Sequence, residues 1–113
     1  MADHITIRPS AGTWVVRAAG AVIAETGAAL ELVEGSYPPV IYFPRDDVAM
    51  AFLEPSATRS TCPHKGEASY YSVIASDGAV KDAAWSYESP KDGVAEIAGY
   101  LAFYPDRVTV EEV

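Results

Sequence analysis

The only cysteine of the chain lies in a short segment that also carries a histidine and a lysine, Thr61-Cys62-Pro63-His64-Lys65-Gly66. A thiol reacts as its thiolate, and neighbouring cations favour that form. His64 follows Cys62 by two residues and is a candidate base for it, although Pro63 leaves the direction of the two side chains open. The alternative is that Cys62 is a small, buried, space-filling residue. From the residues alone both interpretations stand.

Lys65 and Gly66 suggest a second chemistry, the binding of an anion. A lysine supplies a cation for a carboxylate or phosphate, and a glycine allows positive φ and close approach of a ligand. The segment lacks the full glycine pattern of a phosphate-binding loop, so a turn with a solvated lysine is the alternative. We predict no metal site, because the second histidine, His4, is distant in sequence and zinc favours three or four regularly spaced ligands. We also predict no cofactor.

A pair of aromatic residues further along the chain predicts a flat wall. Trp85 and Tyr87 are two residues apart in a strand-like segment, so their side chains should share a face. Such a face can bind a planar or apolar ligand, or it can simply pack in the core. The other candidates for the same cleft are Asp82, Tyr70, Tyr104 and Arg107.

The elements that must position these residues are predicted to be strands. Seven tyrosines and eight prolines favour strands and turns over helices. Alternating or β-branched runs predict strands at 5–8, 13–17, 21–24, 28–34, 40–43, 67–75, 80–87, 101–104 and 107–110. For 28–34 a short helix is the alternative. We expect the first strands to form an antiparallel meander and Ser76-Asp77-Gly78 to close a hairpin.

Two short helices are predicted between the strands. The first should begin at Asp46 and end at Pro55, after which residues 56–61 form a polar stretch. The second should have Ser89 as its N-cap and Pro90 at its first position, with Val94 and Ile97 on its buried face. The predicted fold is therefore mainly β, a compact antiparallel sheet, sandwich or tent-like domain with one or two short helices.

Length and charge exclude several classes of function. The 113 residues fit a single domain, 1–113. A net charge of −8 disfavours nucleic acid and anionic membrane surfaces, which attract basic proteins. A lone cysteine permits no internal disulfide, and there is neither a signal-peptide pattern nor an apolar run of about 18 residues. These features predict a cytoplasmic protein.

Several local strings resemble a known bacterial family, the domain of unknown function 427. They are Pro39-Val40-Ile41-Tyr42-Phe43-Pro44, Leu53-Glu54-Pro55-Ser56, Thr61-Cys62-Pro63-His64-Lys65-Gly66, Ala84-Trp85-Ser86-Tyr87 and Leu101-Ala102-Phe103-Tyr104. The resemblance covers nearly the whole chain and implies a mostly β fold without an established reaction. His64 replaces an aromatic residue found in many members.

The naming of that family also implies a nucleotidyltransferase-like protein. Such enzymes use a Gly-Ser loop and spaced aspartates that hold Mg²⁺. The only adjacent aspartates, Asp46 and Asp47, fit the start of a helix better.

The leading hypothesis is a module that binds a small molecule or anion in a cleft near residues 62–66. Its predicted ligand-binding residues are Cys62, Lys65, Gly66, Asp82, Trp85, Tyr87, Tyr104 and Arg107. One alternative is a small enzyme that uses Cys62 or a Lys65/Asp82 pair as catalytic groups. Another is a homodimeric protein-interaction domain that uses exposed tyrosines.

Overall fold

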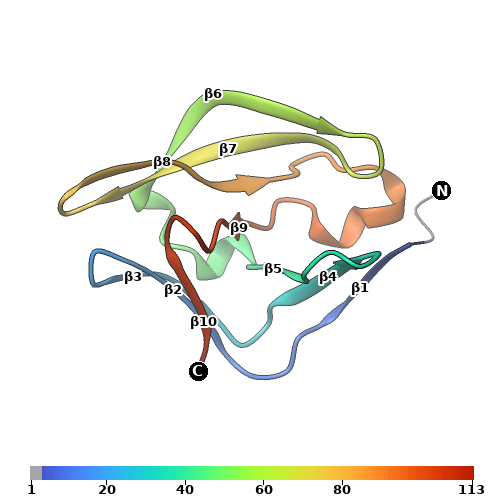
Figure 1. The fold of residues 1–113 in the computed structure, drawn as a ribbon, viewed down its shortest axis with the longest axis horizontal. Helices are drawn as coiled ribbons and strands as arrows, with labels where there is room; N and C mark the ends of the chain where they lie inside the picture. The colour runs from blue at the N-terminus through green and yellow to red at the C-terminus, as the bar shows by residue number, and fades with distance from the viewer. Residues whose placement is uncertain (1–3) are drawn as a thin grey trace.

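The computed structural model describes residues 4–113, and these residues are organised mainly in antiparallel strands (Figure 1). The mainly-β prediction is confirmed. The strands are β1 (Ile5–Pro9), β2 (Trp14–Ala18), β3 (Ala21–Thr26), β4 (Leu30–Glu34), β5 (Val40–Tyr42), β6 (Leu53–Cys62), β7 (Gly66–Ala75), β8 (Gly78–Ser86), β9 (Ala102–Phe103) and β10 (Thr109–Glu112).

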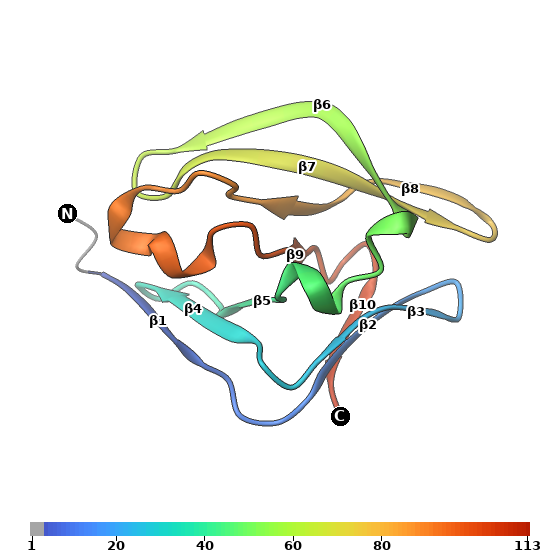
Figure 2. The same ribbon diagram turned by 180° about the vertical axis from the view of Figure 1, so that it is seen from behind.

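Within this part of the chain the strands form three sheets, in the orders β6-β7-β8-β9, β1-β4-β5 and β10-β2-β3. Figures 1 and 2 show the four-stranded sheet along the top, with the two smaller sheets forming a V beneath it. Phe43, just after β5, exchanges two backbone hydrogen bonds with Leu101, just before β9, at 2.7 and 2.9 Å. These bonds tie the β1-β4-β5 sheet to the four-stranded sheet.

The prediction of an N-terminal meander is wrong for its first strand. β2 pairs with β3 as expected, but β1 pairs with β4, with Ile7 opposite Leu32. Between β1 and β2 the chain turns away at Gly12, whose φ of +86° suits a residue without a β-carbon. The partner of β1 is therefore not the next strand in the sequence, and a prediction that pairs adjacent segments misses it.

The first predicted helix is replaced by two 3₁₀ turns, η1 (Arg45–Asp47) and η2 (Met50–Phe52). Asp46 caps neither turn, and Asp47 instead accepts a hydrogen bond of 2.7 Å from the Thr26 hydroxyl. The Ala49 amide donates to Ile23 of β3. These contacts with β3 hold the segment and outweigh its weak preference for an α-helix.

Strand β6 occupies residues predicted to be the end of a helix and a polar loop. It runs through Pro55 and lies at the edge of its sheet. Proline has no backbone N–H to donate. An edge strand tolerates it because one side of its backbone has no neighbouring strand to pair with. Most of β6 is exposed, so its polar residues lack the alternation that predicts a half-buried strand.

The second predicted helix is also a 3₁₀ segment, η3 (Asp92–Ile97), with a kink at Val94. Ser89 is not its N-cap; Lys91 occupies that position and no side chain caps it. Val94 and Ile97 are buried as predicted. No helix among residues 4–113 has the length and apolar character needed to cross a membrane.

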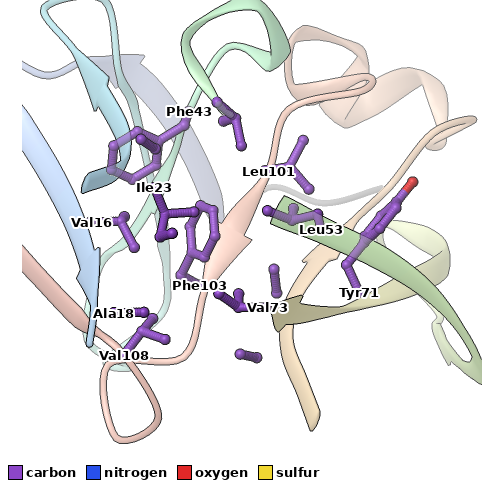
Figure 3. Packing of buried hydrophobic residues seen from close by; sticks show 14 residues of the cluster. Val16, Ala18, Ile23, Phe43, Leu53, Tyr71, Val73, Leu101, Phe103 and Val108 are labelled. Carbon is purple, nitrogen blue, oxygen red and sulfur yellow. The ribbon is translucent and has the colours of Figure 1, made fainter. Parts of the chain in front are cut away.

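Two clusters of buried side chains fill the space between the sheets. Figure 3 shows the larger one, in which Phe43 and Phe103 meet edge to face with ring centroids 5.7 Å apart. The second cluster joins Leu32, Tyr42, Ala68, Tyr87, Val94, Ile97 and Ala102. Cys62, Tyr70 and Trp85 pack against it in part-buried positions. This second cluster supports the residues of the candidate site.

Candidate functional site

An aromatic pocket lies between the four-stranded sheet and the β4–β5 hairpin. It encloses about 210 Å³. The large sheet and its turns contribute Lys65, Tyr70, Trp85, Tyr87 and Tyr104, and the opposite side contributes Leu32, Glu34, Tyr37, Pro38, Val40 and Tyr42. The pocket therefore joins residues that are far apart in the sequence, from positions 32–42, 65–70, 85–87 and 104.

Strand register explains why these side chains converge. Tyr70 of β7 lies directly opposite Trp85 of β8, and Trp85 lies opposite Ala102 of β9. Side chains two residues apart share a face of a strand, so Tyr87 and Tyr104 project on the same side as Trp85 and Ala102. The prediction that Trp85 and Tyr87 share a face is confirmed by their common place in the pocket.

Trp85 connects the two sides of the pocket. Its ring lies 4.4 Å from that of Tyr104, centroid to centroid, at an interplanar angle of 41°. It also meets Tyr42 of β5 edge to face at 6.4 Å. The Trp85 indole N–H donates a hydrogen bond of 3.3 Å to the Tyr42 hydroxyl. Aromatic rings from both layers are thus fixed against one another, which makes a rigid wall.

Tyr42, Tyr87 and Tyr104 of the pocket keep their protons at neutral pH. Burial raises the pKa of Tyr42 and of Tyr87. Burial also raises the pKa of Tyr104, and a hydrogen bond with Tyr70 adds to this effect. A neutral phenol both donates and accepts a hydrogen bond. The pocket therefore presents uncharged hydroxyls beside its ring faces.

An ion pair between Lys65 and Glu34 forms the charged part of the pocket. The Lys65 ammonium lies 2.7 Å from Glu34 Oε1, and the two side chains are only 12% and 21% exposed. The hydrogen bond from Lys65 lowers the pKa of Glu34. Burial opposes the charge on Lys65, but its hydrogen bonds to Glu34 and Cys62 prevail and raise its pKa. The ammonium also lies 5.9 Å from the centre of the Tyr87 ring.

Cys62 and Gly66 belong to the turn that positions Lys65. They form the last pair of the β6–β7 hairpin, and the Lys65 amide donates to the Cys62 carbonyl at 3.3 Å. Gly66 has a φ of +111°, and its nearest contacts are backbone atoms around Pro90 rather than the pocket. The Lys91 amide donates to the Lys65 carbonyl at 3.0 Å. The turn is therefore anchored from both sides.

The two histidines lie close together beside this turn. The rings of His4 and His64 meet edge to face, with centroids 4.6 Å apart. His4 Nε2 lies 3.2 Å from Glu34 Oε2, so both carboxylate oxygens of Glu34 have partners. In the part of the chain from His4 onward, no three His, Cys, Asp or Glu side chains are grouped as they would be around a metal ion.

Asp82 and Arg107 do not line the aromatic pocket. Asp82 lies at a β-bulge with a φ of 51° and accepts a hydrogen bond of 2.6 Å from Thr58. Arg107 donates to the Lys81 carbonyl at 3.0 Å and lines a separate hollow. Lys65 is paired with Glu34 rather than with Asp82, so the structure does not bring the Lys65/Asp82 pair together.

Sequence reasoning missed the β4–β5 side of the pocket, above all Glu34 and Tyr42. Period-two spacing places Glu34 with Leu32 on one face of β4, and Tyr42 with Val40 on one face of β5. That signal indicates a shared face, but it does not say which other sheet the face covers.

An apolar hollow of about 540 Å³ adjoins the aromatic pocket. The two share the lining residues Glu34, Tyr37, Pro38, Val40, Trp85 and Tyr104. The apolar hollow adds Trp14, Pro39, Ile41, Phe103, Pro105 and Val110. The two spaces therefore adjoin one another and differ in chemical character.

Comparison with known proteins places the chain in a family. No curated protein matches it. The family model described as a domain of unknown function (DUF427) matches residues 6–113. That match begins at the second residue of β1, continues through β10 and includes all residues of the aromatic pocket. The chain therefore belongs to the domain of unknown function 427 family.

Proposed function

We propose that this protein binds a small, planar, uncharged molecule in the aromatic pocket. The observation that carries the proposal is the convergence of the Trp85 and Tyr104 rings with the Lys65–Glu34 pair in one space. Sites for small molecules commonly combine apolar and aromatic walls with a few polar groups that fix orientation. The pocket has this composition.

The ring faces favour a planar ligand. Trp85 and Tyr104 are held by contacts with each other, and Trp85 is also bonded to Tyr42. Rigid rings stack on a flat ligand without losing further side-chain freedom, which reduces the entropic cost of binding. Aromatic contacts of this kind contribute about 0.5–1.5 kcal/mol beyond the area that they bury.

The electrostatics favour an uncharged ligand. Glu34 neutralises Lys65 at 2.7 Å, and the whole chain carries a net charge of −8. An anion would have to compete with Glu34 for a largely buried ammonium, and separating a buried pair is costly. Lys65 has three N–H donors, and Glu34 accepts a hydrogen bond from one of them. A further donor suits a carbonyl oxygen of a neutral ligand.

The proposal is tested with benzamide as an uncharged planar probe and with benzoate as its anionic counterpart. Binding is followed by the NMR signal of the Trp85 indole N–H in ¹⁵N-labelled protein. Benzamide should shift this signal in a saturable manner at millimolar concentration, and benzoate should bind at least about tenfold more weakly. Equal affinities for the two probes would contradict the assignment of an uncharged ligand.

A matched pair of variants tests the location. Tyr104→Leu removes one ring of the wall and should weaken benzamide binding roughly two- to tenfold, the range expected for the loss of an aromatic contact. Tyr100→Leu serves as the control, because Tyr100 packs on the second core cluster but does not line the pocket. If the two variants bind benzamide alike, the pocket is not the binding site.

A further inference from the structure

The apolar hollow beside the aromatic pocket has almost no polar side-chain atoms of its own. Of the six residues that it adds, Pro39, Ile41, Phe103, Pro105 and Val110 have wholly apolar side chains. The sixth, Trp14, has one polar atom, and its indole N–H already donates a hydrogen bond of 2.9 Å to Ser10 Oγ. The six added residues therefore offer a ligand contact surface but no free side-chain hydrogen-bonding group.

The aromatic pocket has the opposite character. Lys65, Glu34 and the hydroxyls of Tyr42 and Tyr87 all belong to it, and Lys65, Tyr42 and Tyr87 do not reach the apolar hollow. Trp85 and Tyr104 line both spaces, so their rings lie at the boundary between a polar end and an apolar end. A molecule that occupies both spaces must therefore have a polar part and an apolar part that meet beside these two rings.

The volumes of the two spaces also favour a ligand that occupies both. Pockets for drug-sized ligands enclose about 300–1,000 Å³. The aromatic pocket, at about 210 Å³, falls below this range, whereas the adjoining hollow provides about 540 Å³. The aromatic pocket alone accommodates only a small ring, and most of the combined volume lies in the apolar hollow.

We infer that the natural ligand has two parts, a planar polar head and an apolar substituent that extends past Trp85 and Tyr104 into the hollow. This inference rests on the proposed function, because the head is the molecule assigned there to the aromatic pocket. The ligand class is thus an amide-like or similarly uncharged ring that carries an alkyl or aryl group. We assign both spaces to the same molecule because they adjoin and share six lining residues.

The experiment uses a homologous series of probes, benzamide and its N-ethyl, N-butyl and N-hexyl derivatives. Each methylene that leaves water should tighten binding roughly three- to fourfold until the hollow is filled. The chain has two tryptophans, and the Trp14 indole N–H signal reports on the hollow alone, because Trp14 lines only the hollow whereas Trp85 lines both spaces. Benzamide should shift the Trp85 signal alone, and N-hexylbenzamide should shift both.

A variant of the hollow wall gives an independent readout. Val110→Thr keeps the β-branched shape of this strand residue but places a hydroxyl in the apolar wall. It should weaken N-hexylbenzamide binding at least about threefold and leave benzamide binding unchanged. Ile41→Thr, in β5, should act in the same way. Val22→Thr, an exposed position of β3 outside the cleft, is the control and should change neither affinity.

The outcomes separate this inference from the proposed function. If benzamide shifts Trp85 but longer substituents neither tighten binding nor shift Trp14, the two-part ligand is wrong and the aromatic pocket stands. If the substituents tighten binding but Val110→Thr and Ile41→Thr have no effect, the apolar part lies elsewhere and the inference is again wrong. If no probe shifts the Trp85 signal, both proposals are overturned.

Discussion

The ammonium of Lys65 and the carboxylate of Glu34 form a largely buried ion pair across two sheets, with 2.7 Å between Nζ and Oε1. Lys65 comes from the β6–β7 turn and Glu34 from the end of β4. Each charge is taken from water and is compensated mainly by the other, so loss of either partner leaves an uncompensated charge. This relationship links the stability of the fold to the integrity of the pocket.

A double-mutant cycle should measure the coupling of this pair. Glu34→Gln or Lys65→Met alone should destabilise the fold by about 1–3 kcal/mol, the usual cost of a lost hydrogen bond to a buried charged group. The double variant should lose less than the sum of the two single losses. The measurement is the free energy of unfolding in urea. Strict additivity would show that the two charges do not stabilise each other.

The same pair sets a pH dependence of stability. The pKa of Glu34 is lowered below its ordinary value of 4.5, so its contribution is complete above that value and disappears as the pH falls through the folded-state pKa. The pKa of Lys65 is raised above 10.5, so its contribution is complete below that value and disappears as the pH rises through the folded-state pKa. Between these limits the contribution should be constant.

Chemical denaturation of wild type and Glu34→Gln across this range provides the measurement. The difference in unfolding free energy between them should shrink as the pH falls below 4.5. A difference that grows on acidification would contradict the lowered pKa of Glu34.

Gly66→Ala should destabilise the protein by about 1–2 kcal/mol through its backbone conformation. A β-carbon at this site would meet its nearest atom, the Ser89 carbonyl oxygen, at 3.6 Å, which is ordinary contact. The cost therefore arises from φ of +111° rather than from a clash. Gly27→Ala is the matched control, since its φ lies outside the left-handed region and its β-carbon would meet nothing within 4 Å. It should change stability by less than about 0.5 kcal/mol. Thermal unfolding of both variants would decide; equal shifts would remove the backbone argument.

Asp82 should tolerate asparagine better than alanine. Its φ is 51°, a region that Asp and Asn occupy more readily than other residues with a β-carbon. Its Oδ2 accepts from Thr58 at 2.6 Å, and its Oδ1 is buried without a hydrogen-bond partner. Asp82→Ala loses the Thr58 bond and keeps the strained backbone, so it should cost about 1–2 kcal/mol.

Asp82→Asn retains an acceptor for Thr58 and should cost less than about half as much in the same unfolding assay. If alanine is as stable as the wild type, neither the Thr58 bond nor the backbone conformation contributes to stability.

Much of the large sheet could be predicted from local patterns. Ser76-Asp77-Gly78 marked the β7–β8 turn, and period-two spacing placed Trp85 and Tyr87 on one face. These patterns concern residues within one strand or in adjacent segments. They predict the structure correctly because these features do not depend on contacts with distant segments.

The remainder depended on pairings between distant segments. Glu34 is recognisable as a site residue only when β4 is packed against the turn that carries Lys65, and no local pattern encodes that contact. The expected helices became 3₁₀ segments for a similar reason. The Ala49 and Lys91 amides, for example, bond to Ile23 and Lys65, which belong to other parts of the fold.

Strand β6 has a consequence for the behaviour of the protein at high concentration. An exposed edge strand invites the backbone of a second molecule to continue the sheet, which leads to aggregation. Here Pro55 removes one donor and the register shifts between Pro55 and Arg59. The Arg59 guanidinium also occupies the carbonyls of Ser56 and Thr58, at 2.9 and 2.8 Å. These features of β6 should therefore hinder the pairing of its free edge with a strand of a second molecule.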